Sequence, residues 1–286
     1  MNTKKAIGIL AALIVVGFIG YSIFGTSAKE EAISVRTGKT ANETIVETLS
    51  TTGTLEAEQT QEIFGQGLVT EVDVAVGDQV EENDRLVLYQ DGTAQTANFD
   101  GTVTNVNVVS DEADLSAQTG EAAITLADLS DLKVTVQLTK SDAPLVKKDQ
   151  AVTLSNGSET YSGKVTHIDP VATTIMSQTG NTTALAATIG FDTPPKDVFA
   201  GFDIDSEITT NTAENAIALP IEALLYNDKN KPFVYVIEKG TARAQLIDIG
   251  IQSDTKVEVK DGLTADQTVI LSPDEKIKDG VSVSAK

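Results

Sequence analysis

The chain has 286 residues, with 42 Asp and Glu against 21 Lys and Arg, a formal net charge of −21. This charge argues against a protein that binds DNA, RNA or an anionic membrane surface, because each of these requires clustered basic side chains. The absence of cysteine excludes disulfides, thiol catalysis and cysteine-ligated zinc, and it favours a location outside the cytoplasm. The length suggests about two domains or several smaller modules. Few aromatic residues and no Trp predict a core of Val, Ile, Leu and Ala.

Residues 6–24 form an uncharged apolar stretch that follows Lys4 and Lys5. As a helix, this stretch would be roughly 28 Å long, close to the ~30 Å thickness of the hydrocarbon core of a bilayer. A cleaved signal peptide is the alternative, because residues 26–28 are small, but the apolar region of a signal peptide typically has ~7–15 residues. We predict that residues 1–28 are a cytosolic tail and a retained transmembrane anchor. The protein would then cross the cell membrane once, with its N-terminus in the cytoplasm and its bulk outside.

Beyond the anchor, the sequence predicts an almost entirely β protein. Short runs rich in Val, Ile and Thr alternate with polar residues and are separated by Gly, Asp, Asn and Pro. This pattern is typical of small sandwiches and barrels. The clearest runs are residues 68–76, 133–138, 232–237 and 281–283, and the sequence is compatible with short helices near residues 141–147 and 221–225.

An internal repeat with an offset of 34 residues links segments 67–74 and 101–108. Two similar units this close together predict one small sandwich with a pseudo-two-fold axis. Gly67 and Gly101 would let the chain turn into each strand, and Gly77 would supply the turn after the first. In the second copy, Asp111 replaces Gly77, which predicts a degenerate turn. The repeated positions are Gly67, Val69, Val72 and Val74 in the first copy, and Gly101, Val103, Val106 and Val108 in the second.

The two copies resemble the halves of a biotinyl/lipoyl-like domain, and the segments that follow them resemble further modules of one family. Residues 132–138 resemble the entry to a β-barrel, and residues 199–208, with Gly201, resemble its exit. The C-terminal part resembles a membrane-proximal domain at Pro220, Ala223, Leu224, Gly262 and Leu263. Because the modules occur in family order over nearly the whole chain, the chain resembles the HlyD-like membrane fusion proteins, which are periplasmic adaptors, and in particular the macrolide-exporter type.

This resemblance implies a mainly β fold in which the modules form an elongated array after the N-terminal anchor. The implied domains are N-terminal strands of the membrane-proximal domain at 29–58, the lipoyl-like domain at 59–131 with halves 59–90 and 99–131, the β-barrel at 132–212, and the membrane-proximal domain at 213–286.

One departure from the family concerns the α-helical hairpin that longer adaptors carry between the lipoyl halves. Only residues 90–98 lie between the halves here, whereas a coiled-coil hairpin needs several heptads in each arm. The resemblance is therefore to short adaptors of a single-membrane envelope, and docking to an outer-membrane channel is not expected.

Few residues suggest chemistry. No Lys lies between Lys39 and Lys133, so the lipoyl-like domain cannot carry a lysine-linked prosthetic group. His167 is the only histidine, which excludes a histidine-rich metal site, and neither a nucleophile elbow nor a nucleotide-binding P-loop is present. Asp203, Asp205 and Glu207 would share one strand face, as a calcium site or, the alternative we favour, as a hydrated surface. We expect no catalytic, cofactor or metal site; a glycosidase is disfavoured because sugar sites usually add aromatic platforms.

The implied function is that of an adaptor on an exporter rather than an enzyme. By resemblance, its partners would be the permease and ATPase subunits of an ABC transporter, and the adaptor would form a homo-oligomeric ring. The alternative is a membrane-anchored binding protein for a peptide, polysaccharide or ion at the cell surface. Residues 29–132 carry a net charge of −17 and residues 133–286 carry −6, which predicts a strongly acidic, solvated surface on the first half.

Overall fold

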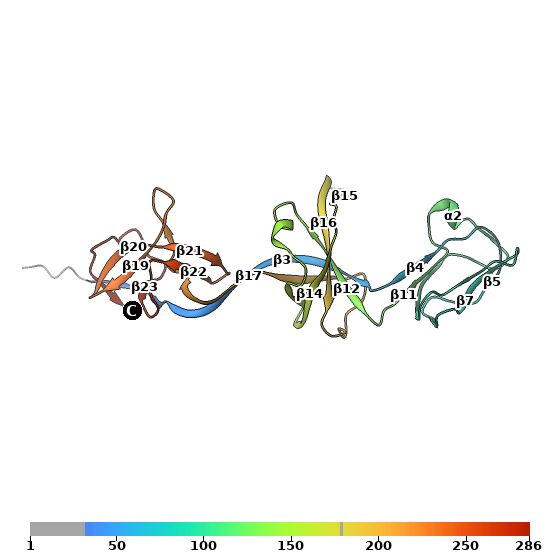
Figure 1. The fold of residues 1–286 in the computed structure, drawn as a ribbon, viewed down its shortest axis with the longest axis horizontal. Coiled ribbons are helices and arrows are strands. Elements are labelled where there is room, and N and C mark those ends of the chain that lie inside the picture. Colours follow the sequence, from blue (N-terminus) through green and yellow to red (C-terminus); the bar gives the residue numbers. More distant parts are fainter. Residues whose placement is uncertain (1–31, 178–179) are drawn as a thin grey trace, which may run out of the picture. The chain divides into compact units, whose positions relative to one another are not determined.

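The computed structural model describes residues 32–177 and 180–286, and these residues form the mainly β structure that the sequence predicts (Figure 1). Contacts divide the chain into two compact units, one of Met1–Ile45 with Ala213–Lys286 and one of Val46–Thr212. The predicted anchor at residues 6–24 lies outside the described residues. Within the described part, no helix has both the length and the apolar character needed to cross a membrane.

Within the larger unit, residues 60–127 form a sandwich of two four-stranded antiparallel sheets. The strand orders are β10-β5-β7-β8 and β6-β9-β11-β4. Each strand of one sheet has its repeat counterpart at the same place in the other, so the repeat in the sequence becomes a pseudo-two-fold axis. The elements are β4 (Thr60–Ile63), β5 (Gly67–Val72), β6 (Gln79–Val80), β7 (Arg85–Tyr89), β8 (Ala94–Thr96), β9 (Gly101–Val106), β10 (Ala113–Asp114), α2 (Ser116–Thr119) and β11 (Ile124–Ala127).

The backbone turns of this sandwich repeat with the same offset of 34 residues. The amide of Gly77 donates to the carbonyl of Val103 at 2.8 Å, and the amide of Asp111 donates to the carbonyl of Val69 at 2.8 Å. Gly77 has a φ of 98° and Asp111 a φ of 66°, so both occupy the left-handed region. The expected degenerate turn is therefore wrong: Asp111 keeps the turn because a short polar side chain tolerates this conformation better than most residues.

A closed β-barrel follows in the same unit, as the family resemblance implies (Figure 1). Its strands run in the order β14-β16-β12-β3-β17, and β13 pairs with both β14 and β17, which closes the sheet. A side chain on Gly53 of β3 would collide with Val134 of β12, so glycine allows these two strands to pack closely. The elements are β3 (Ala41–Ala57), β12 (Leu132–Leu138), η1 (Ala143–Leu145), β13 (Ala151–Asn156), β14 (Glu159–Ile168), β15 (Thr173–Ser177), β16 (Gly180–Phe191) and β17 (Asp203–Pro220).

The smaller unit combines both ends of the described chain. Strand β1 pairs in parallel with β24, and β2 pairs antiparallel with β23, so N-terminal residues complete a C-terminal structure. The elements are β1 (Ile33–Val35), β2 (Thr37–Lys39), η2 (Ile221–Ala223), β18 (Leu225–Tyr226), β19 (Pro232–Glu238), β20 (Thr241–Leu246), β21 (Asp248–Gln252), β22 (Lys256–Asp261), β23 (Thr268–Ile270) and β24 (Val283–Ala285).

The segment 29–58 does not belong wholly to this smaller unit. Strand β3 is one continuous strand that passes from the smaller unit into the larger one, and its residues 53–57 pair with β12 of the barrel. The family resemblance implies that all of 29–58 belongs to the membrane-proximal domain. The structure places residues 46–57 with the barrel instead, because a single long strand supplies both units.

Candidate functional site

The repeat positions of the sandwich share one hydrophobic core. Val69 and Val103 are buried at its centre, and Val72, Val74, Val106 and Val108 are partly buried against it. Gly67 has a positive φ of 117°, whereas Gly101 has none and instead lies where a Cβ would come within 2.9 Å of the carbonyl oxygen of Ala127. These residues position the loops at the end of the sandwich.

A buried polar cluster lies beside this core. Asp114 is only 2% exposed, and its carboxylate accepts hydrogen bonds from the hydroxyl of Tyr89 at 2.6 Å and from the amide of Ser116 at 2.8 Å. The hydroxyl of Ser116 contacts the backbone of Gly65, accepting from its amide at 2.7 Å and donating to its carbonyl at 3.2 Å. These bonds attach the short helix α2 to the end of the sandwich.

Titration of the cluster follows from these contacts. Burial raises the pKa of the Tyr89 hydroxyl, and the neighbouring Asp114 carboxylate raises it further. Burial also raises the pKa of Asp114, but the hydrogen bonds from Tyr89 and Ser116 outweigh it and hold the pKa below its usual value. Asp114 is therefore ionised at neutral pH although it is buried, and no ion pair reaches it within the described residues.

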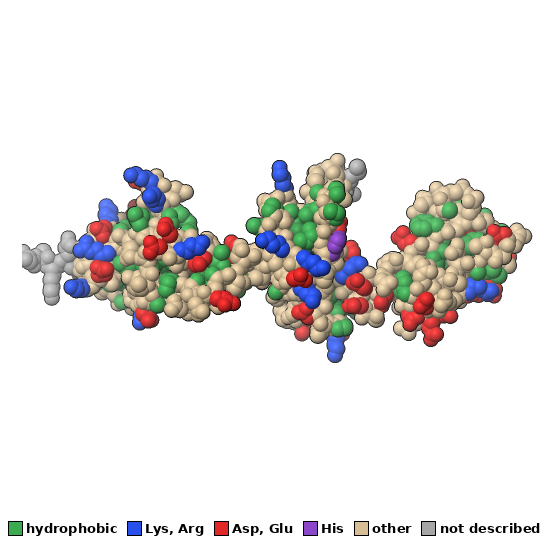
Figure 2. Space-filling model, in the orientation of Figure 1, with side chains coloured by type: hydrophobic (Ala, Val, Ile, Leu, Met, Phe, Trp, Pro, Cys, Tyr) green, Lys and Arg blue, Asp and Glu red, His purple; other side chains and the backbone are tan. Residues whose placement is uncertain are grey.

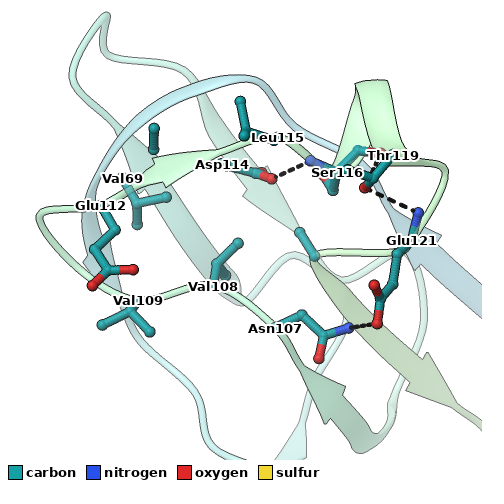
Figure 3. Close-up of a pocket in the computed structure, with 12 residues that line it drawn as sticks. Val69, Asn107, Val108, Val109, Glu112, Asp114, Leu115, Ser116, Thr119 and Glu121 are labelled. Carbon is teal, nitrogen blue, oxygen red and sulfur yellow. Dashed lines mark hydrogen bonds between the residues drawn. The ribbon is translucent and has the colours of Figure 1, made fainter.

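A cavity of about 190 Å³ opens next to Asp114, and we call it the Ala123 slot (Figure 3). Its lining comes from β5 and β10 of one sheet, from the loop that joins β9 to β10, and from α2 with the loop residues on either side of it. The lining residues are Val69, Asn107, Val108, Val109, Glu112, Ala113, Asp114, Leu115, Ser116, Thr119, Glu121 and Ala123. Apolar side chains and carboxylates thus surround the same open space, with Val109 58% and Leu115 51% exposed.

The slot exists because the two halves of the sandwich differ. The amide of Asp73 donates to the carbonyl of Leu86, and the repeat counterpart of Asp73, Asn107, donates to the carbonyl of Ala123. Ala123 therefore occupies the place of Leu86, and both side chains are fully buried. Replacing Leu by Ala in a core leaves a cavity that the surroundings fill only in part. Likewise, where the first half carries the buried Val80, the second half carries Asp114 at the equivalent position.

The loop beside the slot also departs from the repeat. Residues 81–84 join β6 to β7 in the first half, whereas residues 115–123, including α2, join β10 to β11 in the second. The longer loop supplies Leu115 and Glu121 to the slot.

The sandwich is very acidic. Residues 59–131 contain 15 Asp and Glu and a single basic residue, Arg85, a net charge of −14. Arg85 is already paired with Glu71 and Asp73, each at 2.6 Å. Acidic side chains dominate the charged surface of this sandwich in Figure 2. The sandwich therefore presents negative charge to any molecule that approaches it.

The motif positions of the C-terminal part lie mostly in one core. Ala223 is fully buried, and Leu224 and Leu263 are partly buried against the same cluster. Pro220 ends β17 opposite Lys256, and Gly262, with a φ of 100°, comes close to the backbone of Leu246 and Ile247. Gly201 lies in the larger unit, where its amide donates to the carbonyl of Leu55 at 2.7 Å.

The residues considered for metal binding are not brought together into a site. His167 is exposed on β14, with its Nε2 atom 3.4 Å from a carboxylate oxygen of Asp169. Asp203 and Asp205 accept hydrogen bonds from Thr54 and Thr52 on the neighbouring strand. Among residues 32–177 and 180–286, no group of three or more acidic or histidine side chains could hold a metal ion.

Sequence reasoning missed the Ala123 slot and the Tyr89–Asp114 contact. The available signal was the departure from the repeat at Val80/Asp114, because a carboxylate in a position that the other copy fills with a valine needs a buried partner. The identity of that partner, Tyr89, follows only from the pairing of β5 with both β7 and β10.

Comparison with known proteins supports the family resemblance. The model of the YknX C-terminal permuted SH3-like domain matches residues 216–285. YknX of Bacillus subtilis (strain 168), named as an efflux system component, is 29% identical over 65% of this chain and 50% of its own length. The macrolide export protein MacA of Yersinia pestis is 24% identical over 64% of this chain and 49% of its own length. The chain thus spans about half the length of the curated relatives it matches.

The fold agrees with these relatives. The crystal structure of MacA from Actinobacillus actinomycetemcomitans matches with a TM-score of 0.70 and 20% identity, covering 82% of this chain and 99% of that chain. A MacA–MexA chimera carrying the Pseudomonas aeruginosa MexA α-hairpin domain matches with a TM-score of 0.66 and 22% identity, covering 82% of this chain and 100% of the chimera. Proteins of this family are adaptors and not enzymes. The family model and the relatives make the chain similar to membrane fusion, or periplasmic adaptor, proteins of the HlyD and MacA type, and its fold is that of MacA.

Proposed function

We propose that this chain is the extracytoplasmic adaptor subunit of an efflux transporter, and that the transporter is an ABC exporter of the macrolide-exporter type. The observation that carries the proposal is the combination of modules in one chain. A sandwich without a carrier lysine, a closed barrel and a domain matching the YknX C-terminal model form a scaffold for assembly rather than a site for catalysis. The names of the relatives, an efflux system component and a macrolide export protein, point to export.

The proposed arrangement places the adaptor at the cell membrane through the apolar stretch at residues 6–24, with the N-terminus in the cytoplasm. The chain would form a homo-oligomeric ring on the external face of the permease. It would carry the domains given above, with the membrane-proximal domain built from residues 32–45 and 213–286. Retention of residues 1–28 in protein purified from membranes supports the anchor, and an N-terminus at Lys29 in a secreted form contradicts it.

In this proposal the adaptor acts by changing the conformational equilibrium of its partner, and it catalyses no reaction itself. The chain has no nucleotide-binding loop, so any nucleotide energy used for export must come from a partner, which in this proposal is the ATPase of the ABC exporter. An adaptor changes the turnover of that partner only if it binds one conformational state of the permease more tightly than another. The adaptor would therefore change both assembly and ATP turnover without touching the nucleotide.

The test is reconstitution of the full chain with a candidate ATPase and permease. The proposal expects co-purification and a change in ATP hydrolysis when the chain is added. If the chain neither co-purifies nor alters turnover at any salt concentration, the adaptor function is wrong. A membrane-anchored surface binding protein then becomes the better description.

A further inference from the structure

We propose that the Ala123 slot is a docking site for a basic segment of a partner protein outside the membrane, which inserts one Lys or Arg side chain into the slot. The inference goes beyond the adaptor function, since it names a surface and the chemistry that the surface recognises. It rests on the shape of the slot and on the charges around it. It also rests on the difference between the two halves of the sandwich at Leu86/Ala123, at Val80/Asp114 and in the loop that follows β10.

The shape suits a long side chain with an apolar stem and a charged end. Val108, Val109 and Leu115 supply aliphatic walls that remain accessible, while Glu112 and Glu121 bring carboxylates to the same space (Figure 3). Lys and Arg bury their methylene groups against apolar surface and keep the charged end near polar groups. A cavity of about 190 Å³ has room for one such side chain, since a cavity of ~150 Å³ binds benzene.

The carboxylates that line the slot favour a cation as the ligand. Asp114, in the wall of the slot, is a buried carboxylate whose two hydrogen-bond donors, Tyr89 and Ser116, are both neutral. Buried charges are normally paired with an opposite charge, because the loss of hydration is otherwise uncompensated. The one cation of the sandwich, Arg85, is engaged with Glu71 and Asp73. A cation from outside the sandwich would therefore gain more at this slot than at a solvated carboxylate.

Other occupants fit less well. A bare metal ion would need three close ligands, and no such group exists in the described part of the chain. A sandwich of a second copy would bring its own net charge of −14 against the same surface, and like charges oppose such contact. A basic protein segment satisfies both the walls and the carboxylates.

The experiment titrates the full-length chain, in neutral detergent and with ¹³C-labelled Ala and Val methyl groups, with a capped nonapeptide of Lys, Arg, Gly and Ser carrying four positive charges. We expect saturable shifts of the methyl signals of Ala123, Val108 and Val109. The peptide in which Glu replaces each Lys and Arg should cause none. Affinity should fall as salt rises, because screening weakens the attraction between the charges.

Variants separate the slot from general attraction between peptide and domain. Ala123→Leu gives the second half the residue that the first half carries, and it should weaken binding about tenfold by filling the slot. Leu115→Ser changes an exposed residue, so it should fold normally and also weaken binding. Val76→Ser is the control, because Val76 is 62% exposed in the turn that joins β5 to β6 and lies outside the slot.

Three results would overturn the proposal. The first is the absence of saturable shifts at low salt. The second is equal weakening by Val76→Ser and Ala123→Leu, which would indicate only general attraction. The third is a shift of the Ala123 signal with protein concentration alone, which would make a second copy the occupant. Absence of peptide binding by the native chain, with coupling to the ATPase present, would reject the slot and leave the adaptor function standing. Peptide binding at the slot without coupling to the ATPase would reject only the adaptor function.

Discussion

The hydroxyl of Tyr89 donates to the carboxylate of Asp114 in the interior of the sandwich. We predict that Tyr89→Phe destabilises the sandwich by about 1.5–3 kcal/mol, the cost of losing a hydrogen bond to a charged, buried group. Tyr161→Phe is the control, because the Tyr161 hydroxyl donates to the carbonyl of Lys196 at an exposed position and its loss should cost less. Hydrogen exchange in increasing urea measures the two effects, at the β5 and β7 amides for Tyr89→Phe and at the β13 and β14 amides for Tyr161→Phe. Equal effects of the two variants would contradict a special role for the buried pair.

The same contact predicts how stability depends on pH. The folded state raises the pKa of Tyr89 above its ordinary value of 10.0, so this group contributes stability that is complete below pH 10 and is lost as pH rises further. The folded state lowers the pKa of Asp114 below 3.8, so its contribution is present above that pH and is lost as pH falls. In Tyr89→Phe the decline of unfolding free energy above pH 10 should be shallower than in the native chain. Identical slopes in urea titrations from pH 9 to 11.5 would contradict the assignment.

At the scale of single residues, the sequence predicts regular positions better than exceptional ones. The alternation of Val134, Val136 and Leu138 follows from the two-residue period of a strand, and the structure buries all three side chains. The exceptions depend on contacts between segments distant in the sequence. Asp114 is satisfied inside the sandwich because Tyr89, 25 residues earlier, reaches it from β7 on the other side of β5, and because the amide of Ser116 also donates to it.

At the scale of elements, the pairing of β1 with β24 and of β2 with β23 ties the two ends of the described chain together. We predict that deleting residues 1–39 destabilises the smaller unit. The deletion removes Val35 from a core that contains Ile270 and Val283, and it leaves β23 and β24 with unpaired edges that favour aggregation. Deletion of residues 1–31 is the matched control, because it keeps both strands.

Calorimetry and light scattering on the two truncated chains measure this effect. The chain that begins at Thr40 should melt at a lower temperature and scatter more light than the control chain, which begins at Ala32 and keeps both strands. Unchanged melting of the chain that begins at Thr40 would contradict the pairing of the two ends.

The elements also show where prediction from sequence stops. The alternating runs, the short helices and the mainly β fold are predictable from composition and period, and the short η1 and η2 helices lie near the predicted places. The partner of each strand is not predictable, because an alternating strand fits any neighbour that offers an apolar face. The sequence therefore places strand β3 in one domain, although its 17 residues belong to two units.

At the scale of the whole molecule, negative charge is distributed very unevenly. The sandwich at residues 59–131 carries −14, whereas residues 133–286 carry only −6 over twice the length. This imbalance makes the sandwich the part whose contacts depend most on salt. Attraction of a basic segment to the Ala123 slot should weaken with salt, and contact between sandwiches of neighbouring copies should strengthen.

The proposed ring provides the test of this second effect. In a ring of identical subunits, equivalent sandwiches approach one another and repel, and salt reduces that repulsion as the screening length falls from ~30 Å at 0.01 M to ~10 Å at 0.1 M. We predict that the full chain in neutral detergent forms larger assemblies in sedimentation velocity as salt rises over this range. Replacing Glu62, Glu81 and Glu82 by Gln should favour assembly at low salt and flatten the salt dependence. Replacing Glu238 and Glu275 by Gln and Asp254 by Asn removes the same charge outside the sandwich and should change it less. Assemblies that dissociate as salt rises would contradict the prediction, because they would show that attraction between opposite charges holds the ring together.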